Sequence, residues 1–135
     1  MIGSDRQKEL TQPGLMKKRT LVLGASLKPD RYSNLAVRRL VDHGHPVLAI
    51  GRREGSIGEV HVLTTLPEDP AVDTVTLYLN PANQAAWHAI ILELRPERVI
   101  FNPGTEDAGF MRVLNAQGIE AVEGCTLVML ASNTF

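Results

Sequence analysis

At residues 20–34 the sequence reads TLVLGASLKPDRYSN, a largely apolar run that leads through a glycine turn towards a helix. The run at 20–23 is continuous and stops at Gly24, which is typical of a strand covered on both faces. Ser33 is a suitable N-cap for a helix over 34–43. We therefore predict a central strand followed by a helix, the first unit of a parallel sheet.

The alternation of short apolar runs with longer helical segments continues along the chain. It predicts strands at 46–50, 74–79, 98–101 and 119–122, a short edge strand at 60–63, and helices at 81–94 and 105–117. The pattern indicates an α/β protein in three layers, with a mainly parallel sheet of five or six strands. Every strand-to-helix loop then falls on one edge of the sheet, where ligands of such folds bind.

Two of the helices carry clear start signals. Asn80 followed by Pro81 supplies a capping oxygen and then a residue without an amide hydrogen, and Thr105 is a second capping candidate. In the helix over 81–94, small residues recur on one face and are expected to pack closely on the sheet. These residues are Ala82, Ala85, Ala86, Ala89 and Ile90.

Length and composition limit the class of protein. The 135 residues fit one domain, which we expect over 18–135 behind a flexible leader at 1–17. A net charge of -1 gives no broad positive field, so nucleic acid is not an expected partner. The single cysteine, Cys125, and the lack of a signal peptide or a long apolar run favour a cytoplasmic protein without a membrane segment.

The first loop at the ligand edge has features that suit a phosphate. Gly24, Ala25 and Ser26 allow a close backbone approach, and Lys28 lies ahead of the helix start at Ser33 and Asn34. The alternative is a simple tight turn, because the loop lacks the three glycines of the dinucleotide fingerprint.

The second loop, Gly51-Arg52-Arg53, replaces the acidic residue that a typical NAD site carries after its second strand. Two guanidinium groups suit a ribose with an extra phosphate, as in NADP or coenzyme A. A solvated basic turn is the alternative. The remaining loops are expected to line a neutral part of the crevice, unless their asparagines serve only as caps and turns. They contain Asn80, Pro81, Asn102, Pro103 and Gly104.

Several motifs together resemble a known family, the small bacterial CoA-binding domain proteins. They are Gly24-Ala25-Ser26 with Pro29 and Ser33, 66–70 leading to 72–75, 102–106, 116–119 and 123–125, and they span about 18–131. The family is similar to the CoA-binding domain of the succinyl-CoA synthetase α-subunit. The chain departs from it at Gly51-Arg52-Arg53, where many members read Asn-Pro-Lys, and at Asn102, where many have Gln.

The resemblance implies a Rossmann-like fold with coenzyme A as ligand. It implies that 24–27, including Leu27, lie against the phosphates or adenosine, that Arg52 or Arg53 supplies a cation, and that 102–104 line the crevice. No nucleophile, base or metal cluster is predicted at this edge, so we expect a binding module, acting as a sensor or partner subunit, rather than an enzyme. An NADP-dependent oxidoreductase and a scaffold with a vestigial crevice are the alternatives. An open sheet edge and a small-residue helix are compatible with a homodimer.

Overall fold

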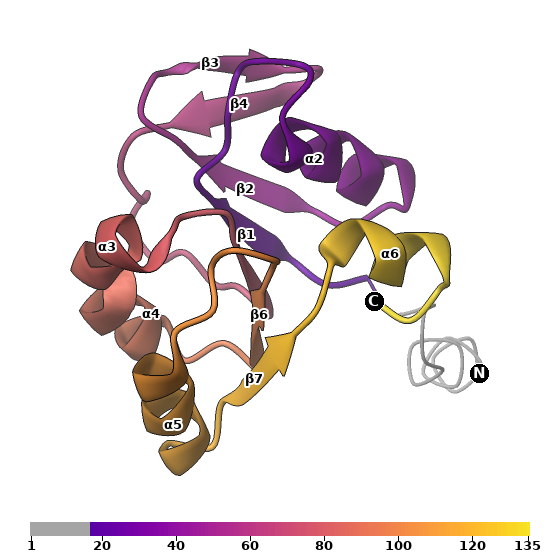
Figure 1. Cartoon of the computed structure of the whole chain (residues 1–135). Coiled ribbons are helices and arrows are strands. Elements are labelled where there is room, and N and C mark those ends of the chain that lie inside the picture. The colour runs from indigo at the N-terminus through magenta and orange to yellow at the C-terminus, as the bar shows by residue number, and fades with distance from the viewer. Residues whose placement is uncertain (1–16) are drawn as a thin grey trace, which may run out of the picture.

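The computed structural model describes residues 17–135, and the leader predicted at 1–17 therefore lies outside the described residues except for Lys17. Seven strands form one sheet in the order β3-β4-β2-β1-β5-β6-β7 (Figure 1). The strands are β1 (Thr20–Leu23), β2 (Val47–Ile50), β3 (Gly55–Ile57), β4 (Val60–Leu63), β5 (Thr74–Leu77), β6 (Arg98–Phe101) and β7 (Glu120–Glu123). The helices are α2 (Tyr32–Asp42), α3 (Pro81–Gln84), the 3₁₀ turn η1 (Ala85–Trp87), α4 (His88–Leu94), α5 (Ala108–Ala116) and α6 (Thr126–Ala131).

The helices cover both faces of the sheet, so the molecule has three layers (Figure 1). On one face α2 and α6 pack side by side, and Val37 and Leu40 of α2 join Val22 of β1 in one apolar cluster. On the other face Ile91 of α4 and Leu114 of α5 pack with Leu21 and Leu23 of β1 in a second apolar cluster. All residues of β1, β5 and β6 are buried. The predicted central strand and the three-layer α/β fold are confirmed.

The sheet has seven strands, and the prediction of five or six was wrong. The missed strand, β3, forms an antiparallel hairpin with β4 through Gly58, whose φ is +58°. Because β4 also pairs with β2, it lies inside the sheet, and β3 takes the edge position that was predicted for 60–63. A strand of three residues carries too little periodicity to be found from sequence. Helix α6 was missed as well.

The predicted cap at Asn80 is confirmed, whereas those at Ser33 and Thr105 were wrong. Asn80 Oδ1 accepts a hydrogen bond from the Asn83 amide at 2.9 Å, with Pro81 in the first turn. The first predicted helix begins earlier, at Tyr32, and Ser33 Oγ instead accepts a hydrogen bond from the Ser26 amide.

The helix predicted over 105–117, α5, begins later than predicted, at Ala108. Asp107 caps it by accepting a hydrogen bond from the Phe110 amide at 3.0 Å. The Thr105 hydroxyl is buried and donates to the Asn102 carbonyl. The hydroxyls of Ser33 and Thr105 thus stabilise the loops before the helices instead of capping the helices. Short polar side chains near a helix start can make either kind of hydrogen bond.

The helix predicted over 81–94 is interrupted by η1, and its small-residue face points away from the sheet. Ala82, Ala86 and Ala89 are exposed, whereas Gln84 and Ile91 are fully buried. Gln84 can occupy the interior because its amide donates to the carbonyls of Leu79 and Thr105 and its oxygen meets His88 Nε2 at 2.9 Å. Because the polar Gln84 is buried, the face of this helical segment that packs on the sheet is not the small-residue face that the apolar pattern predicts. No helix among residues 17–135 combines the length and apolar character that crossing a membrane requires.

A cluster around His45 closes the amino edge of the sheet. His45 is 7% exposed, accepts a hydrogen bond from the Lys18 amide at Nδ1, and packs on the ring of Phe135. Burial, followed by the positive charges of Lys17 and Lys18, lowers the pKa of His45 to about 4. The fold therefore requires a neutral imidazole at this position.

The His45 cluster predicts acid destabilisation. Between pH 6.5 and pH 4 the unfolded chain binds a proton that the folded chain rejects, so the free energy of unfolding should fall by up to about 1.4 kcal/mol per pH unit across that range and stay flat above it. Urea unfolding at a series of pH values measures the slope. His45→Asn, which keeps an acceptor, should flatten most of it, leaving the part due to His88, whose pKa burial also lowers. The exposed His61, changed to Asn, is the matched control, and an unaltered slope in His45→Asn would show this explanation to be incorrect.

Candidate functional site

The parallel strands end in register at one edge of the sheet. Pairing aligns Leu23 with Ile50 on one side and with Leu77 on the other, and Leu77 with Phe101. After β1 the chain builds β2, β3 and β4 on one side, and only then β5, β6 and β7 on the other side. The loops after β1 and β5 therefore lead in opposite directions, which opens a crevice at the switch point.

Gly24 brings the loops after β1 and β5 together. Its φ is +95°, and a Cβ there would lie 3.0 Å from the carbonyl carbon and oxygen of Tyr78. The amides of Gly24 and Ala25 both donate to the Ile50 carbonyl at 3.0 and 2.9 Å. Only glycine fits this position, but these two amides serve the fold and are not available to a phosphate.

The rest of the first loop is also held by its own polar groups. The Ser26 amide donates to Ser33 Oγ, the Lys28 amide donates to Ser26 Oγ, and Asn34 Nδ2 donates to the Ser26 carbonyl. Ser33 and Asn34 are buried and position the loop. The cationic side chain of Lys28 remains exposed, as does that of Arg31, beside the start of α2, where no side chain of the described residues caps the first turn. The loop therefore leaves an uncapped helix start and two exposed cations at this edge.

Gly51 fixes the second loop against the first. A Cβ on Gly51 would lie 2.2 Å from the Ala25 carbonyl oxygen, a distance that no side chain tolerates. The Gly51 amide donates to the Leu63 carbonyl at 2.9 Å. Both arginines that follow are exposed, but Arg52 lines the pocket whereas Arg53 lies outside the pocket lining. Of the two predicted arginines, the structure brings only Arg52 to the pocket.

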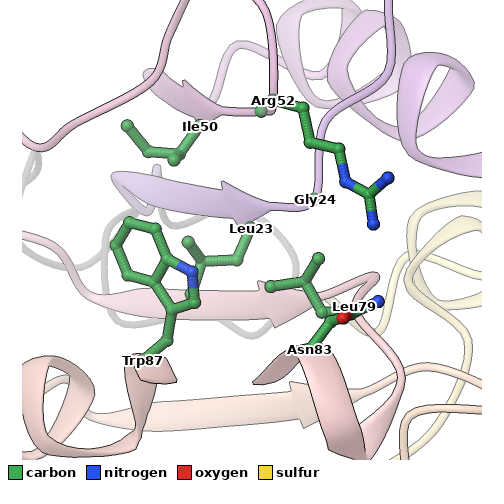
Figure 2. A pocket seen from close by; sticks show the side chains of 8 residues that line it. Leu23, Gly24, Ile50, Arg52, Leu79, Asn83 and Trp87 are labelled. Carbon is green, nitrogen blue, oxygen red and sulfur yellow. The ribbon is translucent and has the colours of Figure 1, made fainter. Parts of the chain in front are cut away.

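A pocket of about 260 Å³ occupies the switch point (Figure 2). Besides Gly24, Gly51 and Arg52, five residues that were not predicted from the sequence line it. They are Leu23, Ile50, Leu79, Asn83 and Trp87. Asn83 and Trp87 are four residues apart and share a helix face, a spacing that could have pointed to them.

The fourth predicted loop supports the fold instead of lining the pocket. Asn102 is 2% exposed, and its Nδ2 donates to Thr76 Oγ1 and to the Leu77 carbonyl, while its Oδ1 accepts a hydrogen bond from the Thr126 amide. Pro103 and Gly104 are exposed and do not line the pocket. Asn80 and Pro81 begin the helix that carries Asn83, so they position the pocket wall without forming it.

Tyr78, whose backbone carbonyl lies against Gly24, carries a buried hydroxyl. Tyr78 Oη has no hydrogen-bond partner among the described residues, and burial raises the pKa of Tyr78 to about 12. The phenol is therefore protonated at neutral pH. Residues 17–135 contain no group of three His, Cys, Asp or Glu side chains placed to hold a metal ion.

A doubly wound parallel sheet with a pocket at its switch point defines the class: the chain is a Rossmann-like α/β domain. Within that class, the chain belongs to the CoA binding domain family, whose model matches residues 18–131.

Solved structures share the fold. A crystal structure of an uncharacterized protein has 48% sequence identity and a TM-score of 0.84, covering 88% of this chain and 98% of that one. A Thermus thermophilus structure covers both chains completely with 23% identity and a TM-score of 0.78. A hypothetical protein from Pyrococcus horikoshii has 19% identity and a TM-score of 0.77, covering 97% of this chain and 90% of that one. No curated protein matches the chain.

Proposed function

We propose that this protein binds coenzyme A or an acyl-CoA at the carboxyl edge of its sheet, without catalysing a reaction, as a cytoplasmic sensor or partner subunit. The observation that carries the proposal is the pocket in which Gly24, Gly51 and Arg52 meet at the switch point, in a chain of the CoA binding domain family. The ribose phosphate of the ligand is assigned to Arg52. The pyrophosphate is assigned to the open start of α2 with Lys28 and Arg31.

NADP is the second candidate, because Arg52 suits any ribose that carries an extra phosphate. Calorimetric titration with CoA, acetyl-CoA, NADP and NAD separates the two. We expect heat of binding with CoA and acetyl-CoA and much weaker binding of the two dinucleotides. Tight binding of NADP without binding of CoA would favour an oxidoreductase-like site. No heat of binding with any of the four ligands would favour a scaffold with a vestigial crevice.

The two neighbouring arginines provide a matched pair of variants. Arg52→Ala should weaken CoA binding by about 10-fold to 100-fold, since hydrogen bonds to a charged group contribute about 1.5–3 kcal/mol. Arg53→Ala, which removes the same charge outside the pocket, should change the affinity by less than about threefold.

Calorimetry with CoA and with dephospho-CoA checks the assignment. Dephospho-CoA lacks the ribose phosphate and should bind the Arg52→Ala variant and the unaltered protein equally well. If both ligands lost affinity to the same extent, Arg52 would have another role.

A further inference from the structure

The pocket is too small to hold a whole coenzyme A molecule. Sites that enclose a drug-sized ligand have volumes of about 300–1,000 Å³, whereas this pocket has about 260 Å³. It can enclose one planar group, and the rest of the ligand must lie along the loops outside. The question is which part of the ligand the lining selects.

The two ends of the pocket differ in chemistry (Figure 2). At one end the indole of Trp87 lies beside Leu23 and Ile50, and at the other the Arg52 guanidinium extends towards Leu79 and Asn83. A flat aromatic ring beside aliphatic side chains suits a nucleobase, because every base has a π-face that stacks on tryptophan. A base at the Trp87 end would leave its ribose pointing towards the arginine.

The backbone around Trp87 is fixed from both sides. Gln84, three residues before it, is fully buried and anchors the segment through the carbonyls of Leu79 and Thr105. His88, the next residue, stacks on Phe110 with ring centroids 3.6 Å apart. Trp87 itself is partly buried and packs against the apolar core. The backbone that carries the indole is therefore held in place before any ligand arrives, which reduces the entropy lost on binding.

We infer that Trp87 stacks on the adenine base of the bound ligand and makes the site specific for the adenine-nucleotide end of coenzyme A. This inference rests on the proposed function and deepens it, since it assigns the base to one wall of the same pocket. The protein then recognises the nucleotide half of CoA firmly, and the pantetheine arm contributes less to the affinity.

Trp87 is the single tryptophan of the 135-residue chain, so its emission, excited at a wavelength that tyrosine does not absorb, reports on this position alone. The full chain is titrated with CoA, adenosine 3′,5′-bisphosphate and phosphopantetheine, and calorimetry measures binding of each ligand in parallel. CoA and the bisphosphate should change the emission, while phosphopantetheine should leave it unchanged.

Two substitutions separate stacking from packing. Trp87→Phe keeps an aromatic face and should retain CoA affinity within about fivefold, whereas Trp87→Leu keeps apolar bulk only and should lose about 10-fold to 100-fold for CoA and for the bisphosphate. Thermal unfolding of both variants confirms that they are folded. The stacking would be overturned if CoA bound without a change in tryptophan emission and the two variants had equal affinities for CoA. The proposed function would then remain intact. An absence of heat with CoA and of any emission change with the bisphosphate would overturn both.

Discussion

Replacing Asn102 by Leu is expected to lower the free energy of unfolding by about 2–5 kcal/mol. The side chain is 2% exposed and makes three hydrogen bonds, to Thr76 Oγ1, the Leu77 carbonyl and the Thr126 amide. Leucine has a similar volume but leaves the buried Thr126 amide and the Leu77 carbonyl without these partners, and each unsatisfied group costs about 1–3 kcal/mol. A loss of this size is a large part of the total stability of a typical domain, which is about 5–15 kcal/mol.

Urea unfolding of Asn102→Leu measures this loss, and thermal unfolding should show a midpoint about 10–20 °C lower. Asn115→Ala is the control, since Asn115 is exposed and its side chain makes one hydrogen bond, of 3.3 Å, to the Ala121 amide. The control should lose less than about 1 kcal/mol. Equal stabilities of the two variants would mean that Asn102 does not hold β5, β6 and α6 together.

The second large effect is expected at Gly51. Adding one methyl group in Gly51→Ala places a carbon 2.2 Å from the Ala25 carbonyl oxygen, which is backbone and cannot rotate away. The loops after β1 and β2 must separate, so we expect a stability loss of about 1–3 kcal/mol. Because Gly24 and Arg52 line the pocket from these two loops, CoA affinity should fall at least about tenfold.

Gly109→Ala is the matched control for Gly51→Ala. A Cβ at Gly109, in α5, meets its nearest neighbour at an ordinary 3.5 Å, and alanine favours the helix by about 0.5–1 kcal/mol. The control should therefore be as stable as the unaltered protein or slightly more stable, with unchanged calorimetric affinity for CoA. A Gly51→Ala protein that unfolds and binds like this control would contradict the tight junction between the two loops.

The sequence predicted the strongest local signals of the fold correctly. The strand at 20–23 is buried on both faces and central, and the Asn80-Pro81 helix start has the geometry that its side chains dictate. Both predictions succeeded because a few neighbouring residues determine the conformation there without help from the rest of the chain. The predictions at Ser33 and Thr105 failed because a hydroxyl can bond to a loop as readily as to a helix start, and the outcome depends on tertiary packing.

The candidate site was predicted in part. Gly24 and the second-strand arginine could be placed from the order of strands, since loops of parallel strands share an edge. Trp87 was missed, because its spacing from Asn83 indicates only a shared helix face. Which face meets the sheet depends on the fully buried Gln84, a polar residue that sequence patterns assign to the surface. Asn102 was assigned to the crevice, although its side chain joins β5, β6 and α6 in the interior.

The most direct test is a crystal structure of the protein grown with coenzyme A. We predict electron density for the adenosine at the switch point, with its base beside Trp87 and its ribose phosphate within hydrogen-bond distance of Arg52. Density for the nucleotide at any other surface, with an empty pocket between Gly24 and Trp87, would contradict the account.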